Sequence, residues 1–187
     1  MKNMNLLTLN SIDHLVHPEE LDEISLDSPA VAVFTDFKEH KPLEIESDIP
    51  ADQAEYLMRK AHVRLKLVVD SKAELLGNIS LTQLSDQNIL IHQQKGLDRE
   101  DIMVKHLMTP RSDIKALDYK EMMNSTIADV IETLKKDGAQ HCLVVETNEH
   151  QIRGIISTSD IARRLHMPLD IETKTTTFVD VLKAINN

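Results

Sequence analysis

The stretch Leu143-Val144-Val145-Glu146, followed after a short polar segment by Gly154-Ile155-Ile156-Ser157-Thr158-Ser159-Asp160, decides the fold because the chain contains the same pattern twice. The earlier copy reads Leu67-Val68-Val69-Asp70 and then Gly77-Asn78-Ile79-Ser80-Leu81-Thr82-Gln83. Corresponding residues lie 76 positions apart before the polar segment and 77 apart after it. A repeat of this length predicts two copies of one supersecondary unit, with a surface between the copies on which a ligand can bind.

The residues around the first copy predict a strand, a helix, two strands and a helix. Alternation of apolar and charged residues predicts the first strand over 42–46, and an apolar face repeating at helical spacing predicts a helix that opens at Pro50. The two strands are predicted over 65–69 and 75–81, and a further helix after Ser80.

The residues around the second copy predict the same order. A short strand is expected over 114–117, and Ser125 is a plausible N-cap for a helix that stops at Gly138. Paired strands follow, and then a helix that carries Ile161 and Leu165. The strands are predicted over 141–145 and 152–156.

The fold class that follows is α/β, or more narrowly α+β. Neither unit buries its sheet alone, so we expect two β-α-β-β-α units packed sheet to sheet with pseudo-twofold symmetry. The expected organisation is an acidic N-terminal arm (1–27), a first unit (28–97), a second unit (98–166) and a C-terminal extension with a short helix (167–187). The second unit is expected to open with a helix that Asp98 caps and that runs to about Leu107.

Composition excludes several classes of function. The net charge of −10 and the scarcity of aromatic residues argue against a partner that is nucleic acid or a membrane surface. No apolar run approaches the roughly 20 residues that span a bilayer. Cys142 is the only cysteine, which excludes an intrachain disulfide and fits a reducing cytoplasm, where we expect the protein to reside.

Signatures of catalysis or metal binding are also missing from the sequence. The nine histidines are dispersed without a ligand spacing, so no metal site is expected. With only four glycines, a phosphate-binding glycine loop is nearly excluded, and no nucleophile and base can be nominated. We therefore expect the protein not to be an enzyme and to require no cofactor.

The repeated order of elements resembles a pair of CBS domains, the cystathionine-β-synthase type, over roughly 28–166. The run Val104-Lys105-His106-Leu107-Met108-Thr109-Pro110 resembles the family's segment that leads into its first strand. The run 154–160 is similar to the family's Gly-apolar-x-(Ser/Thr)-x-x-(Asp/Asn) signature. The resemblance implies a stand-alone tandem CBS protein, a non-catalytic regulatory module that forms a homodimer. It also implies a ligand such as AMP, ADP, ATP or S-adenosylmethionine in a cleft between the units.

Ser157 and Asp160 are the sharpest candidates for ligand binding. A carboxylate can accept hydrogen bonds from the hydroxyls of a ribose, and a serine hydroxyl with backbone N–H groups at a helix N-terminus suits a phosphate. The resemblance assigns these roles to the two positions and places Thr158 between them. The alternative is a helix capping box, which Ser-x-x-Asp forms equally well.

The first copy has Gln83 in place of the aspartate, beside Ser80 and Lys66 at the positions that match the second unit's site. A neutral acceptor binds a diol more weakly than a charged one, so we expect one good nucleotide site and a weaker one in the first unit.

The resemblance adds further ligand-binding residues on two segments. Met108, Thr109 and Pro110, with Arg111 after them, match the segment that lies beside the adenine, although a helix end stopped by proline explains them as well. His141 and Cys142 begin the strand that lines the base pocket in the family, and Cys142 is also explained as a small buried residue. The basic residues nearest in sequence to a bound phosphate are Lys105, Arg111, Arg163 and Arg164.

Two functions remain open from the sequence. The first is a sensor that binds an adenosine-containing nucleotide and signals to an unknown partner protein by a change of conformation. The alternative is a scaffold for dimerisation or protein docking that binds no small ligand.

Overall fold

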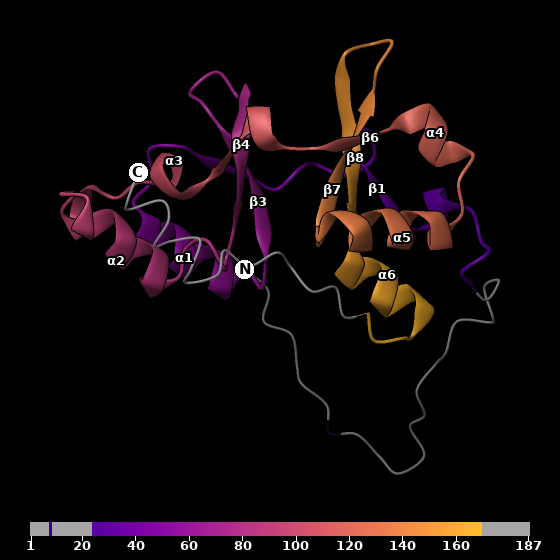
Figure 1. Ribbon diagram of the computed structural model, residues 1–187, viewed down its shortest axis with the longest axis horizontal. Coiled ribbons are helices and arrows are strands. Elements are labelled where there is room, and N and C mark those ends of the chain that lie inside the picture. The colour runs from indigo at the N-terminus through magenta and orange to yellow at the C-terminus, as the bar shows by residue number, and fades with distance from the viewer. Residues whose placement is uncertain (1–7, 9–23, 170–187) are drawn as a thin grey trace.

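The computed structural model describes residue 8 and residues 24–169, which form two lobes, each with one four-stranded sheet and its own helices (Figure 1). Most of the expected N-terminal arm and the short helix expected in the C-terminal extension lie outside the described residues. This mixed α/β architecture confirms the predicted fold class of two repeated units.

The first sheet has the strand order β2-β3-β4-β5. Strands β2 and β3 run parallel, as a helical crossover between them requires, and the other neighbours are antiparallel. The strands are β2 (Glu44–Glu46), β3 (Leu65–Val69), β4 (Leu75–Ser80) and β5 (Thr109–Pro110). The helices of this lobe are α1 (Ala51–Lys60), α2 (Asp86–Gln94), α3 (Val104–Leu107) and the 3-10 turn η2 (Arg99–Asp101).

The second sheet repeats this pattern in the order β1-β8-β7-β6. Its strands are β1 (Phe34–Asp36), β6 (Ala116–Asp118), β7 (His141–Glu146) and β8 (Gln151–Ser157). Its helices are α4 (Tyr119–Met123), α5 (Ile127–Asp137) and α6 (Thr158–Leu165), and the 3-10 turns are η1 (Ala30–Val33) and η3 (Arg111–Asp113).

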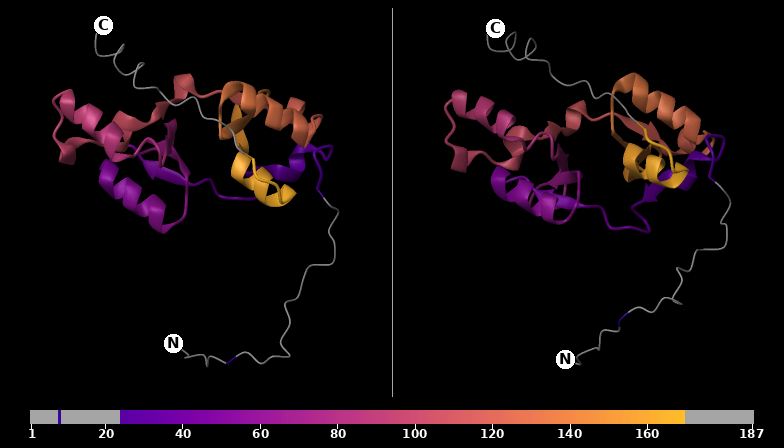
Figure 2. Two further views of the ribbon diagram at one scale, coloured as in Figure 1. Left: turned by 60° about the horizontal axis from the view of Figure 1, so that its bottom comes forward. Right: turned by 90° about the horizontal axis from the view of Figure 1, so that it is seen from below.

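In each sheet, one of the two edge strands comes from the other side of the expected boundary between the units. Strand β1 precedes the first lobe in sequence but pairs with β8, and β5 follows the expected boundary at 97/98 but pairs with β4. Figure 2 shows the two chain segments that cross between the lobes as a result, one between β1 and β2 and one between β5 and β6.

Glycine at the repeated positions 77 and 154 permits this pairing. A Cβ atom on Gly77 would lie 2.2 Å from the carbonyl oxygen of Thr109 in β5. A Cβ atom on Gly154 would lie 2.2 Å from the carbonyl oxygen of Thr35 in β1. The two glycines of the sequence repeat therefore have one structural reason: an edge strand passes too close for any side chain.

A separate aliphatic core lies between each sheet and its helices. In the first lobe Val68 and Ile79 of the sheet pack with Met58 of α1 and Ile89 of α2. In the second lobe the equivalent Val144 and Ile156 pack with Leu134 of α5 and with the rest of that core. The other residues of the second core are Ala30, Val33, Met122, Ile127, Val130, Ile131 and Ile161.

The opposite faces of the two sheets carry a second, smaller set of buried residues. Leu67 and Leu143 are only 7% and 4% exposed, yet neither belongs to a core on the helix side. They alternate with Val68 and Val144 along their strands and therefore lie on the faces turned away from the helices.

Three predicted helix starts differ from the structure. Helix α2 begins at Asp86 rather than directly after Ser80, because the Ser80–Gln83 hydrogen bonds close a turn first. The helix expected from Asp98 to Leu107 is split into η2 and α3, because Ile102 is extended and its carbonyl accepts from Ala51 N–H at 2.8 Å.

The third difference concerns the cap of α5. Thr126, rather than the expected Ser125, accepts from the N–H of Asp129, and the carboxylate of Asp129 accepts from the Thr126 N–H at 2.8 Å. Ser125 instead donates to the carbonyl of Glu121. Gly138 ends α5 in the left-handed conformation, with φ 68°, as predicted.

None of the helices between residues 24 and 169 has both the length and the apolar composition to span a bilayer.

Candidate functional site

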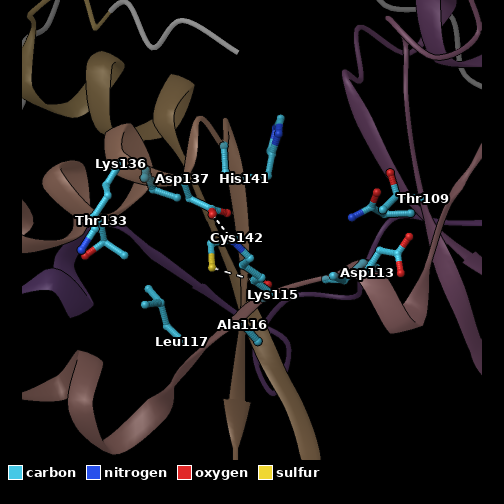
Figure 3. A pocket seen from close by; sticks show the side chains of 14 residues that line it. Thr109, Asp113, Lys115, Ala116, Leu117, Thr133, Lys136, Asp137, His141 and Cys142 are labelled. Atoms are coloured by element: carbon cyan, nitrogen blue, oxygen red, sulfur yellow. Dashed lines mark hydrogen bonds and ion pairs between the residues drawn. The ribbon is translucent and has the colours of Figure 1, made fainter. Parts of the chain in front are cut away.

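A cleft of 490 Å³ lies where the two lobes meet (Figure 3). Asn78 of β4 and Thr109 of β5 line it from the first sheet, and His141 and Cys142 of β7 line it from the second. Asn78 and Thr109 are paired neighbours in their sheet, so the two side walls are held by strands rather than by loops. The volume falls in the range that encloses a nucleoside-sized ligand.

Gln83 holds the first wall in place from behind. Its side-chain amide donates to the Thr109 hydroxyl at 2.9 Å and to the carbonyl of Leu107 at 3.2 Å. Its carbonyl oxygen accepts from the backbone N–H of Ser80 at 2.9 Å and from the Ser80 hydroxyl. Gln83 therefore uses its own polar groups to fix the residue that lines the cleft.

His141 and Cys142 form the second wall at the start of β7. Burial lowers the pKa of His141, and the positive charge of Arg64 lowers it further against the opposing effect of Asp160. Burial raises the pKa of the Cys142 thiol. Both side chains are therefore neutral at pH 7, which suits contact with a flat, uncharged ring.

Charged groups line the floor and the outer side of the cleft. Lys115, next to β6, makes an ion pair with Asp137 at the C-terminal end of α5. Lys136 and Asp113 also line the cleft, on opposite sides of it (Figure 3).

The N-terminus of α6 forms a second group of predicted site residues, separate from the lining of the cleft. Ser157 and Thr158 are buried, at 7% and 8% exposure. The Ser157 oxygen caps α6 by accepting from Asp160 N–H at 3.4 Å and lies 2.6 Å from the Ser159 hydroxyl. The carboxylate of Asp160 accepts from Arg163 at 2.6 Å, so it does not reach back to complete a capping box.

The structure thus distributes the predicted ligand residues between two places. Thr109, His141 and Cys142 line the cleft, whereas the lining drawn from the described residues includes neither Asp160 nor Ser157. His141 connects the two places, because it is the paired neighbour of Ser157 between β7 and β8. The predicted residues outside that lining are Ser157, Thr158, Asp160, Met108, Pro110 and Arg111.

The predicted residues of the weaker first-unit site serve the structure of their own lobe. Lys66 donates to the carbonyl of Glu44 at 2.9 Å across the β2–β3 pair. Ser80 and Gln83 bond to each other as described above, and Gln83 touches the cleft only through Thr109.

Three of the four predicted phosphate partners are engaged elsewhere. Lys105 pairs with Asp48 at 2.7 Å, Arg163 with Asp160, and Arg164 donates to the carbonyl of Ala32. Arg163 follows Asp160 by three residues, a spacing at which side chains on a helix meet. Arg111 is exposed on η3.

Sequence reasoning missed most of the floor and outer wall of the cleft. These residues come from the segment before and within β6 and from the last turn of α5, which the chain brings together through parallel pairing of β6 with β7. The sequence offered one signal for these residues, namely that the strand expected over 114–117 follows shortly after the predicted ligand-binding segment 108–110. The missed residues are Asn78, Asp113, Ile114, Lys115, Ala116, Leu117, Thr133, Leu134, Lys136, Asp137 and Ala139.

The lining of the cleft has polar and apolar groups that can bind a small molecule. The cleft offers neutral donors and acceptors on Asn78, Thr109 and Thr133, and apolar contact from Ala116 and Leu117. Among the described residues, no cluster of three or more His, Cys, Asp or Glu side chains has the geometry to hold a metal ion.

Comparison with known families identifies the second half of the chain. A family model described as "CBS domain" matches residues 100–167. A search of curated proteins finds no significant match to the chain.

Solved structures share the fold over most of the described chain. An uncharacterized conserved protein from Pyrococcus horikoshii is 20% identical with a TM-score of 0.56, covering 79% of this chain and 98% of its own. CBSX2, solved in complex with AMP, is 17% identical with a TM-score of 0.54, covering 73% of this chain and 94% of its own.

A third structure is the CBS domain pair of the protein MJ0100, in complex with 5′-methylthioadenosine and S-adenosyl-L-methionine. It is 17% identical with a TM-score of 0.51, covering 75% of this chain and 94% of its own. At these identities the likeness establishes the fold, which is that of a CBS domain pair.

Proposed function

Because residues 100–167 match the model of the CBS domain family and the chain has the fold of a CBS domain pair, we propose that it is a regulatory module that binds an adenosine-containing nucleotide in the cleft between its two lobes. CBS domain proteins are typically regulatory and non-catalytic, and we propose the same of this chain. Ligand binding would signal to a partner protein by changing the arrangement of the lobes, in a homodimer that resides in the cytoplasm.

The observation that carries the proposal is the cleft itself. Its 490 Å³ volume suits a nucleoside, and its walls come from the β4–β5 pair of the first sheet and the β6–β7 pair of the second. A ligand that touches both Thr109 and His141 would bind one arrangement of the lobes better than another, which is the thermodynamic requirement for a switch. Relatives of the same fold that were solved with AMP, or with 5′-methylthioadenosine and S-adenosylmethionine, support an adenosine ligand.

The predicted residues at the α6 N-terminus remain part of the proposal as a phosphate or ribose contact. Ser157 and Thr158 are buried next to His141, and Asp160 acts on the pKa of His141 through its charge. A ligand seated against His141 would therefore reach this end of α6 if it extends along β7 toward Ser157.

The first test is calorimetric titration of AMP, ADP, ATP and S-adenosylmethionine into the protein. One ligand per chain is expected. Binding of two would show that the first unit also carries a working site, and no binding by any of the four would refute the sensor function.

Two variants then locate the ligand. Ala116→Phe places a large side chain in the cleft from an exposed strand position and should abolish binding, whereas Ala61→Phe, exposed at the end of α1, is the matched control. Asp160→Ala removes a charged acceptor and should weaken binding about tenfold to a hundredfold, because such a bond contributes ~1.5–3 kcal/mol. Loss of binding in Asp160→Ala alone would place the ligand at α6 rather than in the cleft.

A ligand-free docking scaffold remains the second candidate, favoured by apolar side chains exposed on the helices of the first lobe. Tyr56 and Leu57 of α1 are 61% and 42% exposed, and Leu90 of α2 is 53% exposed. A scaffold would keep its oligomeric state and partner binding in Ala116→Phe and lose them when Tyr56 and Leu90 are replaced by polar residues.

A further inference from the structure

The charges around the cleft are balanced, and this bears on which ligand it accepts. Lys115 and Lys136 are the basic residues of the lining, and Asp113 and Asp137 are its acidic ones. The Lys115 ammonium is already paired with the Asp137 carboxylate. The lining therefore has no net charge, within a protein whose net charge is −10.

One residue type that often holds polyphosphates is missing from the lining that the structure describes. Among the described residues that line the cleft there is no arginine, whose planar guanidinium binds phosphate through two parallel hydrogen bonds. Of the four predicted basic partners, Lys105, Arg163 and Arg164 are engaged with other groups, and Arg111 is exposed on η3 outside the lining.

Helix α5 borders the cleft with its C-terminal end, which is the unfavourable end for binding an anion. Thr133, Leu134, Lys136 and Asp137 belong to the last turns of α5, and Ala139 directly follows its cap at Gly138. The C-terminal end of a helix carries a partial negative charge, which disfavours phosphate and attracts donors or cations.

We infer that this cleft selects adenosine compounds whose 5′ substituent is uncharged or positively charged, and discriminates against nucleotides with a polyphosphate. The inference rests on the proposed function and names the ligand class of the same site. The balance of two lysines against two aspartates, together with the C-terminal end of α5, is the feature that determines the preference (Figure 3).

The test compares 5′-methylthioadenosine, AMP and ATP by calorimetry at a low ionic strength of about 20 mM, where surface charges are least screened. 5′-Methylthioadenosine is expected to bind at least about tenfold more tightly than ATP, with AMP between them. Raising the salt concentration should strengthen ATP binding and so reduce the difference in affinity between 5′-methylthioadenosine and ATP. Tightest binding by ATP would overturn this inference alone, and no binding by any of the three or by S-adenosylmethionine would overturn the proposed function together with it.

Variants of the acidic residues check that charge is the cause. Asp113→Asn and Asp137→Asn each leave the cleft with a net positive charge and should tighten ATP binding about threefold to tenfold while changing 5′-methylthioadenosine binding less than about twofold. Asp98→Asn is the matched control, because it makes the same change in total charge at an exposed position outside the lining. An equal gain of ATP affinity in Asp98→Asn would contradict a local origin of the preference.

Discussion

Single residues at repeated positions determine how the two lobes are joined. Gly77 and Gly154 occupy matching positions in the sequence repeat, but the sequence does not indicate why they are glycines. The structure supplies the reason, since β5 passes over Gly77 and β1 passes over Gly154 at distances that exclude a Cβ atom.

Replacing either glycine with alanine should therefore displace the crossing edge strand. We expect Gly77→Ala and Gly154→Ala each to lower the free energy of unfolding by about 1–3 kcal/mol, because the opposing atoms are backbone carbonyls that cannot rotate away. Urea denaturation measures the change. A loss of a few tenths of a kcal/mol in both variants would contradict the close approach.

The two variants should differ in ligand binding. Gly77 lies against Thr109, which lines the cleft, whereas Gly154 lies against Thr35, which does not. Gly77→Ala should weaken binding of the adenosine ligand at temperatures where both variants are folded, and Gly154→Ala is its matched control.

At the scale of elements, helix boundaries depend on which polar side chain takes the capping role. Ser125, Thr126 and Asp129 all precede or open the apolar face of α5, and the intrinsic N-cap preference ranks serine above threonine. The structure selects Thr126, because Ser125 bonds back to the carbonyl of Glu121 at the end of α4.

This selection gives a prediction for the stability of α5. Thr126→Ala should lower the free energy of unfolding by about 1 kcal/mol, since the N–H of Asp129 loses its acceptor at the N-terminus of the helix. Ser125→Ala should lower the free energy of unfolding by clearly less, because the Glu121 carbonyl that loses its donor lies near solvent. Thermal denaturation of the two variants side by side checks the order, and the opposite order would mean that Ser125 is the functional cap.

At the scale of the whole molecule, residues before the first lobe are held on the second. Arg153 of β8 donates to both carboxylate oxygens of Asp36 in β1, at 2.8 and 2.7 Å, and also to Glu146 at 3.1 Å. Its guanidinium lies 4.6 Å from the ring centre of Tyr119. This network fastens the N-terminal strand to β8, which lies more than a hundred positions later in the sequence.

The network makes the stability of the protein depend on pH in the acid range. The hydrogen bonds from Arg153 lower the pKa of Asp36 from 3.8 to about 2. Since the pKa is lower in the folded state, the stabilisation is fully present above pH 3.8 and is lost as the pH falls from 3.8 toward 2.

Asp36→Asn should therefore lower the free energy of unfolding by about 1–2 kcal/mol at pH 6, and the difference from the wild type should shrink as the pH falls from about 4 to about 2. Urea denaturation at a series of pH values measures both. Asp70→Asn is the control, because Asp70 accepts turn N–H groups from Lys72 and Glu74 as Asp36 does from Lys38. A difference between Asp36→Asn and wild type that is constant with pH would contradict the assignment.

The sequence alone determined the fold class, the repeat and the character of each core. Apolar periodicity and the repeated Gly and Ser positions are local signals, and they place β3, β4, β7 and β8 within a residue of their observed bounds. The left-handed stop at Gly138 was predictable for the same reason, since glycine is the residue that favours this conformation.

Only the tertiary structure decided which strands cross between the lobes and which predicted site residues share one place. Local sequence does not encode that β1 and β5 pair outside their own unit, because edge pairing depends on contacts between residues distant in the chain. For the same reason Thr109, His141 and Cys142 meet Asn78, Lys115 and Asp137 in one cleft, while Asp160 turns to Arg163 at the start of α6.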